Sequence, residues 1–404
     1  MGSEAGIKAT RSERLGSHRI NPSKVRSVDF ILLLVTLILV AFGLIMVFSS
    51  SYYYSISRTG SPFTYLIRDG IWVIIGLGAM LLGSMLDYRK YNNRTFVLVI
   101  LGICLLLLII VLTPLGTEIN YASRWITVGP ITIMPGEIAK AGMILLAAWF
   151  FSDKPARSES LIFGIAPMAA VMVIFAFLIL LQPNLSTAIT LCGITVAMML
   201  VAGMRWLYVV IMAGGGIASL LILVRNDPGY WGERFTGFLN PFGDTADSSY
   251  QIVQSLLALG SGELFGVGLG KSVQKSLYLP EPQNDFILAI IGEELGFVGI
   301  ILLILAYSVF LWRGTRVAIK AQDQFGMLLA SGVVIMVAIQ VILNIAVVTS
   351  SMPATGINLP FISYGGNALI IFMFLTGVIL NISRHEPEKV EAARAAAKVA
   401  AEAK

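Results

Sequence analysis

Ten apolar segments divide the sequence, and each is long enough, or nearly long enough, to cross a lipid bilayer as a helix. They lie at about 30–50, 71–86, 96–113, 137–151, 161–181, 186–203, 206–224, 286–312, 327–350 and 361–382. The chain is 57% hydrophobic and 13% charged, whereas soluble domains are about one-quarter charged. The sequence therefore predicts an all-α polytopic membrane protein with about ten transmembrane helices.

The distribution of basic residues predicts how these helices cross the membrane. If the N-terminus is cytoplasmic, 20 of the 28 lysine and arginine residues fall on the inner side, in agreement with the positive-inside rule. Both termini are then cytoplasmic. Residues 1–28 form a basic tail, residues 29–384 the membrane domain and residues 385–404 an Ala-rich tail. The large extracellular loop 225–285 joins helices seven and eight, and loops of this length are often functional.

Histidine and cysteine usage excludes several kinds of chemistry. The two histidines, His18 and His385, lie in the polar tails, so the membrane body can hold neither a Ser–His triad nor an HExxH zinc site. The two cysteines, Cys104 and Cys192, lie in apolar segments and are typical of small hydrophobic residues rather than of a disulfide framework. Any catalysis must therefore use carboxylates, lysine, arginine, hydroxyls or the backbone.

The stretch Tyr278–Glu294 places acidic residues around the start of the eighth apolar segment. Its four carboxylates belong to Glu281, Asp285, Glu293 and Glu294. Pro280 and Pro282 disfavour a helix, so we expect the helix to begin near Asn284 or Asp285. A charge buried in a membrane helix costs about 2.5–3.5 kcal/mol or more, and such groups usually face a protein interior or a watery cavity. Asp285 itself is either a helix N-cap or a general base.

Other polar residues also have both a structural and a functional interpretation. Glu137 and Lys140, three residues apart on the fourth segment, form either a structural ion pair or part of a site. Arg124 beside Trp125 is either an interfacial anchor or a ligand contact. Asn344, like most polar residues in membrane helices, is more typical of a contact between helices.

In the predicted topology these residues share the outer side of the membrane. The set comprises Arg124, Glu137, Lys140, Gln182, Lys275, Glu281, Asp285 and Asn344. Independent structural pairs need not lie on one side, so we expect the set to line a single outward-facing polar cavity. Ser272 and Lys275 also match the SxxK pattern of penicillin-binding folds, but no SDN or KTG companion is present. We interpret that match as coincidence.

Several longer motifs follow the order found in one protein family. They are SRWITVG, the pattern PxExxK (Pro135, Glu137, Lys140), the ERF…NP segment near Arg234, YQIVQS, GVGLGKSVQK, YLPEPQNDFILAIIGEELGFVG and NIAVVTSSMPATGINLPFISYGG. Over about residues 28–385 the chain resembles the SEDS family, the peptidoglycan polymerases RodA, FtsW and SpoVE. The wording of SLYLPEPQNDF is more similar to FtsW and SpoVE than to RodA.

The resemblance implies ten spans and a glycosyltransferase that polymerises lipid II at the outer face of the bacterial cell membrane. It implies that Asp285 is the essential catalytic residue and that Glu281, Arg124 and Lys140 belong to the site. It also implies a class B penicillin-binding transpeptidase as partner, together with other divisome or elongasome membrane proteins, and no nucleic acid.

The sequence departs from the family pattern at three places. LQPNLST has Asn184 where an acidic residue is usual, and SYGGN ends in Asn367 where serine is usual. The fourth segment reads MPGE over Met134–Glu137, where QPSE is common. A role that needs an acidic side chain at position 184 is therefore not expected in this chain.

The expected chemistry suits these residue types. Pyrophosphate is a good leaving group, and forming a β-linkage from an α-linked donor inverts the sugar carbon, so one displacement with one base suffices. Asp285 would take the proton of the acceptor hydroxyl. The residues expected to bind substrate are Arg124, Glu137, Lys140, Arg234, Lys275 and Glu281. A divalent cation, Mg²⁺ or Mn²⁺, held by Asp285 or Glu281 could share the task of offsetting the pyrophosphate charge.

Two other classes of function remain open at this point. A flippase for a lipid-linked precursor would also use a polar cavity, but it should carry binding groups near the midplane together with internal repeats or broken helices. A non-catalytic scaffold for division or elongation would tolerate substitution of Asp285. Within the family, the elongation-type RodA paralogue is the alternative to a role in division or sporulation.

Overall fold

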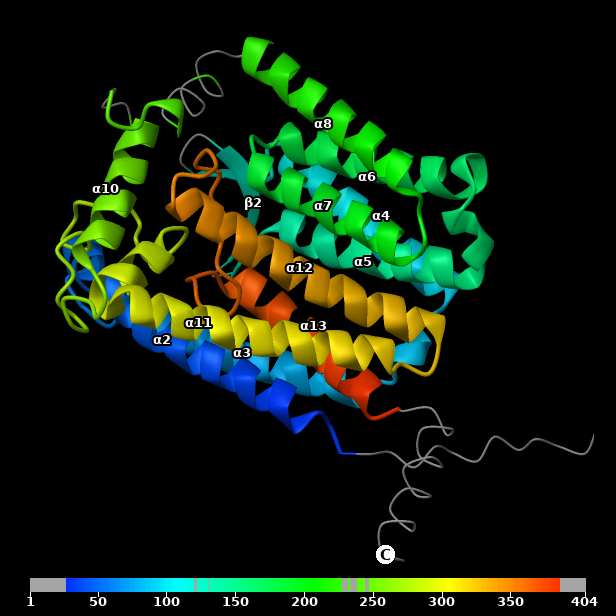
Figure 1. Ribbon diagram of the computed structural model, residues 1–404, viewed down its shortest axis with the longest axis horizontal. Helices are drawn as coiled ribbons and strands as arrows, with labels where there is room; N and C mark the ends of the chain where they lie inside the picture. The colour runs from blue at the N-terminus through cyan, green and yellow to red at the C-terminus, as the bar shows by residue number, and fades with distance from the viewer. Residues whose placement is uncertain are drawn as a thin grey trace, which may run out of the picture.

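The computed structural model describes residues 27–119, 122–129, 131–226, 232, 238–243 and 247–385. A helix occupies each of the ten segments predicted from the sequence, which confirms the helical membrane fold (Figure 1). In chain order these helices are α2 (Phe30–Thr59), α3 (Thr64–Met85), α4 (Arg94–Val111), α5 (Pro135–Asp153), α6 (Ala166–Leu180), α7 (Leu185–Val201), α8 (Trp206–Asn226), α11 (Ile287–Ile319), α12 (Gln324–Val348) and α13 (Gly366–Ser383). Shorter helices in the connections are η2 (Tyr88–Tyr91), η3 (Pro155–Ser158), η4 (Leu161–Ile165) and α10 (Asp247–Ser261).

Eight of the helices in the described part of the chain are long and apolar enough to cross a membrane, where η4 and α6 together count as one helix, Leu161–Leu180. The two others are α7, which has 17 residues, and α5, which carries Glu137 and Lys140 in its first two turns. The protein is thus a multi-pass membrane protein, and the number of ten spans stays a prediction. Helix α10 lies in the large loop 225–285, for which no helix was predicted from the sequence.

The connections between helices gather at two ends of the bundle (Figure 1). At one end the Asp29 N–H donates to Ser383 Oγ at 3.0 Å, and the Asp29 carboxylate pairs with Arg313 at 2.5 Å. Tyr88 donates to Asp323 at the same end, at 3.2 Å. We call this the tail end, because α2 begins there and α13 ends there. The opposite end, which holds the connections before α5, α7, α11 and α13, is the site end.

A small antiparallel sheet, absent from the sequence prediction, joins α4 to α5 at the site end. Its strands, in spatial order, are β1 (Gly116–Ile119), β2 (Ala122–Val128) and β3 (Ile131–Ile133). Ile126 of β2 lies opposite Ile133 of β3, and Gly129 takes the left-handed backbone (φ 61°) at the turn between them. The β-branched residues of this segment favour strands.

Helices α3 and α13 pack with their backbones in close contact. A Cβ atom added to Gly377 would lie 2.1 Å from the Met80 carbonyl oxygen, and one added to Gly83 would lie 2.5 Å from the Phe374 carbonyl oxygen. Apolar burial drives association weakly inside a membrane, so helix pairs there rely on small residues that allow close packing. These glycines therefore hold α13, which leads from the site end, against α3.

Helix α11 is broken at Gly296, whose backbone (φ 66°, ψ −168°) leaves the helical region. A break frees carbonyl groups before it and N–H groups after it, and inside a bilayer such groups need partners. The loop 262–268 inserts at the break and supplies them. The four hydrogen bonds join Val267 N–H to Glu293 O, Gly268 N–H to Glu294 O, Phe297 N–H to Glu263 O and Val298 N–H to Leu264 O, at 2.9–3.0 Å. A Cβ on Gly296 would lie 2.3 Å from Gly266 N, so this fit requires glycine.

Two adjacent carboxylates before the break hold the residues that follow this loop. Glu294 pairs with Lys275 at 2.6 Å and accepts from the Ser49 hydroxyl at 2.7 Å, with the Lys275 side chain 2% exposed and that of Glu294 fully buried. Glu293 accepts from the Ser272 hydroxyl at 2.5 Å and from a loop N–H at 2.8 Å. Ser272 and Lys275, the residues of the SxxK pattern, therefore attach the loop to α11.

Replacing Gly377 by Ala should destabilise the protein, because the new Cβ must push α13 away from the Met80 carbonyl. Overpacking of this kind costs about 1–3 kcal/mol. We expect a lower apparent melting temperature in detergent. The matched control is Gly102→Ala on α4, where an added Cβ would meet nothing within 4 Å. Equal melting temperatures for the two variants would contradict the close α3–α13 contact.

Replacing Lys275 by Met should leave the Glu294 charge buried without its partner, which costs about 3–5 kcal/mol. We expect a clear loss of thermal stability and faster proteolysis of the 262–286 loop. The double variant Lys275→Met/Glu294→Gln should recover much of that loss, because neither charge is then unpaired. If the stability lost in the double variant equals the sum of the losses in Lys275→Met and Glu294→Gln alone, direct coupling between the two side chains is ruled out.

Candidate active site

Asp285 lies in the non-helical segment that precedes α11, at the site end. The helix begins at Ile287, and its N-cap, Phe286, makes no side-chain capping bond. The expectation that the helix begins at Asn284 or Asp285 is thus wrong by two or three residues, and Asp285 is not the N-cap. This excludes the N-cap interpretation of its carboxylate.

The Asp285 carboxylate faces the backbone of a second loop. A Cβ placed on Gly356 would lie 3.1 Å from Asp285 Oδ2, and Gly356 has a left-handed backbone (φ 75°). The segment is held there by Asn344 of α12, whose Nδ2 donates to the Asp285 carbonyl at 2.8 Å and to the Ile357 carbonyl at 2.6 Å. Asn344 is fully buried. A buried amide therefore fixes the catalytic candidate and the 350–365 loop to the same helix.

Two further hydrogen bonds join the Asp285 segment to the start of α13. The Tyr364 N–H donates to the Gln283 carbonyl at 2.9 Å, and the Ser363 hydroxyl donates to the Asn284 carbonyl at 2.7 Å. The carbonyls of the two residues that precede Asp285 are thereby tied to one loop. Such ties restrict the backbone around Asp285 before any substrate arrives.

Glu281 has a strained backbone for a non-glycine residue, with φ at 45°. Its Oε2 accepts from Asn284 Nδ2 at 2.8 Å. Backbones of this kind cost energy and are often found at functional sites. The position supports Glu281 as a site candidate, and its contact with substrate stays a prediction.

Glu137 and Lys140 form a buried ion pair in the first two turns of α5. Lys140 Nζ lies 2.7 Å from Glu137 Oε1, and the two side chains are 3% and 9% exposed. Glu137 Oε2 is buried without a hydrogen-bond partner among the described residues. A Cβ on the adjacent Gly136 would lie 2.9 Å from the Thr187 methyl, which places the pair beside the start of α7. The ammonium is thus oriented by one carboxylate oxygen, while the other oxygen is buried without a partner among the described residues.

Arg124, on β2, reaches the start of α7, where its guanidinium donates to the Pro183 carbonyl. The next residue, Asn184, is the N-cap of α7: its Oδ1 accepts from the Thr187 N–H at 3.2 Å and from the Ser186 hydroxyl at 3.0 Å. Asparagine and aspartate cap helices about equally well. The departure from the family pattern at position 184 therefore preserves the cap.

The start of α7 connects Arg124 to the Asp285 region. Ser186 Oγ lies 3.4 Å from the Gly356 carbonyl, on the loop that the Asp285 carboxylate faces. Asn367, the other departure, donates to the Thr132 carbonyl of β3 at 2.6 Å and so joins α13 to the sheet. The site end thus collects Arg124, Glu137, Lys140, Glu281, Asp285 and Asn344. The outward-facing cavity itself stays a prediction.

Three predicted residues stand apart from this group. Lys275 is buried in its pair with Glu294, so a contact with substrate would require that pair to open. Gln182 donates to the Leu108 carbonyl at 3.0 Å and is 1% exposed, which is a contact between helices. Arg234 lies outside the described residues.

Sequence reasoning missed Gly356, the capping role of Asn184 and the sheet that carries Arg124. The glycine in SSMPATGINLP was visible only as one irregular residue among several. The cap was visible in principle, since Asn184 comes directly before an apolar segment. The alternation of polar and apolar residues in ASRWITV is too short to distinguish a strand from an irregular connection between two membrane helices.

Comparison with characterised protein families gives an independent view of the chain. The family model FtsW/RodA/SpoVE, described as "Cell cycle protein", matches residues 29–388. Stage V sporulation protein E of Bacillus subtilis is 42% identical over 364 residues, which cover 90% of this chain and 99% of that protein. The probable peptidoglycan glycosyltransferase FtsW of Geobacter metallireducens is 37% identical over 365 residues, covering 90% and 97% of the two chains.

Solved structures agree with this assignment. A chain from a study of "polymerization and crosslinking by a peptidoglycan synthase complex" superposes with a TM-score of 0.71 and 26% identity, covering 88% of this chain and 98% of that one. The rod shape determining protein RodA of Thermus thermophilus superposes with a TM-score of 0.66 and 26% identity, covering 89% and 98%. The match spans the membrane body and includes the Asp285 segment, so this chain belongs to the FtsW/RodA/SpoVE family of cell cycle proteins.

Proposed function

We propose that the protein is a peptidoglycan glycosyltransferase that polymerises lipid II. The observation that carries the proposal is the Asp285 carboxylate, which caps no helix and faces the backbone of Gly356, at the same end of the bundle as Arg124 and Lys140. The family relatives support the activity, since one of them is named a probable peptidoglycan glycosyltransferase.

In the proposed reaction Asp285 is the general base. It accepts the proton of the attacking sugar hydroxyl while the oxygen of that hydroxyl displaces pyrophosphate at the anomeric carbon. One displacement inverts that carbon. The hydrogen bonds from Asn344 and Ser363 to the carbonyls of residues 285 and 284 keep the base in place, so little reorganisation is needed at the transition state.

The cationic residues would stabilise the leaving pyrophosphate. Lys140 has a single hydrogen-bond partner among the described residues, Glu137, so further N–H groups on its ammonium can donate to phosphate oxygens. Arg124 on β2 and Arg234 in the large loop are the second and third candidates. Lys275 would act by fixing the loop to α11, as its pair with Glu294 indicates.

A divalent cation is compatible with the residues of the site. No group of three or more histidine, cysteine, aspartate or glutamate side chains is placed to hold a metal ion within the described ranges. Mg²⁺ often binds through one or two carboxylates together with substrate phosphates. Asp285 or Glu281 would hold the ion with lipid II pyrophosphate as the remaining ligand, and the ion would offset phosphate charge.

We also propose that the tail end is cytoplasmic and the site end faces outward. The connections at the tail end contain Arg89, Lys90, Arg157 and Arg205 among their basic residues, in agreement with the positive-inside rule. In a lipid II polymerase this orientation places the base on the side where cell-wall strands are assembled.

The relatives support a role in division or sporulation rather than elongation. Identity is 42% to a sporulation protein and 37% to FtsW, against 26% to the solved RodA. A class B penicillin-binding transpeptidase is the proposed partner, supported by the likeness to a chain of a peptidoglycan synthase complex. Other divisome membrane proteins are proposed on the same ground.

The break in α11 does not support the flippase alternative. A transporter uses the backbone groups freed at a broken helix to bind its cargo. In α11 the groups freed at Gly296 are taken up by the 262–268 loop, so they offer nothing to a substrate.

Replacing Asp285 by Asn should abolish glycan polymerisation by purified protein supplied with lipid II, with and without the cognate transpeptidase. Loss of a general base lowers the rate about 10²–10⁴-fold. The matched control is Asp87→Asn at the tail end, where asparagine can still accept the Arg89 N–H. If Asp285→Asn folds and still forms chains at the rate of the control, Asp285 is not the base.

Replacing Gly356 by Ala should lower the polymerisation rate about tenfold or more, because the new methyl displaces the Asp285 carboxylate and small misplacements are costly in catalysis. Gly60→Ala is the control: its backbone is equally left-handed (φ 73°), but an added Cβ would meet nothing within 4 Å. Both variants carry similar backbone strain. Equal rates for the two variants would show that Gly356 does not position the base.

A further inference from the structure

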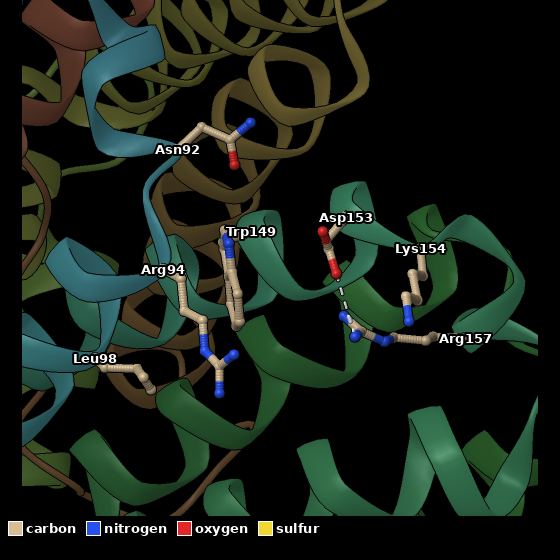
Figure 2. A pocket seen from close by; sticks show the side chains of 7 residues that line it. All are labelled: Asn92, Arg94, Leu98, Trp149, Asp153, Lys154 and Arg157. Atoms are coloured by element: carbon tan, nitrogen blue, oxygen red, sulfur yellow. Dashed lines mark ion pairs between the residues drawn. The ribbon is translucent and has the colours of Figure 1, made fainter.

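A cavity of about 610 Å³ opens at the tail end, where the start of α4 meets the end of α5 and the helix η3 (Figure 2). Its lining residues are Asn92, Arg94, Leu98, Trp149, Asp153, Lys154 and Arg157. None of them belongs to the proposed active site, which lies at the opposite end of α5. The cavity is therefore separate from the proposed active site.

The lining carries more positive than negative charge. Arg157 is already engaged: it pairs with Asp153 at 3.2 Å, donates to the Phe150 carbonyl at 2.8 Å and lies over the Phe150 ring at 4.5 Å. Arg94 and Lys154 have exposed side chains and no hydrogen bond or ion pair within the described part of the chain. Arg94 and Lys154 are thus available to a ligand, whereas Arg157 is held in place by its own contacts.

One side of the cavity is apolar and continues onto the membrane surface of α4. Leu98 is 46% exposed, and its neighbours Phe96 and Val99 are 38% and 54% exposed. Trp149, in the last turns of α5, forms another wall, and tryptophan is enriched at the level of lipid headgroups. A ligand that fills the cavity therefore meets both cationic side chains and a lipid-facing apolar strip, with Arg94 and Leu98 next to each other on α4 (Figure 2).

We propose that this cavity binds the headgroup of an anionic phospholipid. The phosphodiester would accept hydrogen bonds from Arg94 and Lys154, which are the strong, charge-assisted kind, and the acyl chains would lie along the Leu98 face of α4. Basic pockets between membrane helices are known to select anionic headgroups. A free phosphate ester would satisfy the same cations, but it would make no use of the apolar strip.

The test is lipid retention by the full chain, purified in mild detergent, stripped of lipid and titrated with phosphatidylglycerol under native mass spectrometry. We expect Arg94→Gln/Lys154→Gln to weaken binding of the first lipid about tenfold, since each basic residue near a headgroup contributes substantially. The matched control is Lys90→Gln/Arg205→Gln, which removes two exposed cations from the same end of the molecule but outside the cavity.

Two further ligands separate the alternatives. Phosphatidylethanolamine, which has no net charge, should bind the wild type weakly. Soluble glycerol phosphate should not displace phosphatidylglycerol at equal concentration. The proposal is overturned if the control variant loses as much binding as the cavity variant, if phosphatidylethanolamine binds equally well, or if glycerol phosphate displaces the lipid. That last result would assign the cavity to a soluble phosphate ester instead.

Discussion

The lack of water inside a bilayer is the constraint on which the arrangement of this protein depends. A backbone N–H or C=O in lipid must find a partner in the protein, and the break at Gly296 of α11 would leave several without one. The 262–268 loop meets this demand with four backbone hydrogen bonds, and Glu293 and Glu294 add side-chain bonds to the residues that follow. The loop that leads to Asp285 is consequently an integral part of the helix bundle.

The same principle governs the proposed active site on a smaller scale. Asp285 lies in irregular backbone, and buried side chains bond the backbone groups of this segment in place of a helix. Asn344 bonds two carbonyls from two different loops, and Asn184 completes the start of α7. Amides suit these positions because they pair with backbone without adding a charge. The charged groups that remain, among them Asp285 and Lys140, are those to which we assign chemistry.

Hydropathy alone was enough to locate all ten helices, because the bilayer sets both their length and their composition. The polar residues of the site were also identifiable, since charges are rare in such segments. What the sequence did not reveal depends on contacts between distant residues. Phe286 rather than Asp285 caps α11 because Asn344 and the 350–365 loop hold the preceding segment out of the helix. Likewise, nothing local to Gly296 indicates that a loop thirty residues earlier enters the helix there.

The bonds that Glu293 and Glu294 form with earlier parts of the chain bear on how the protein is synthesised and inserted. Their partners Ser272 and Lys275 precede them in the chain, and Ser49 belongs to the first described helix, so every partner has been synthesised before the two carboxylates emerge from the ribosome. A segment with two acidic residues inserts poorly into lipid by itself. We therefore expect the first half of α11 to insert together with the preceding loop and α2, which already carry the partners of its two carboxylates.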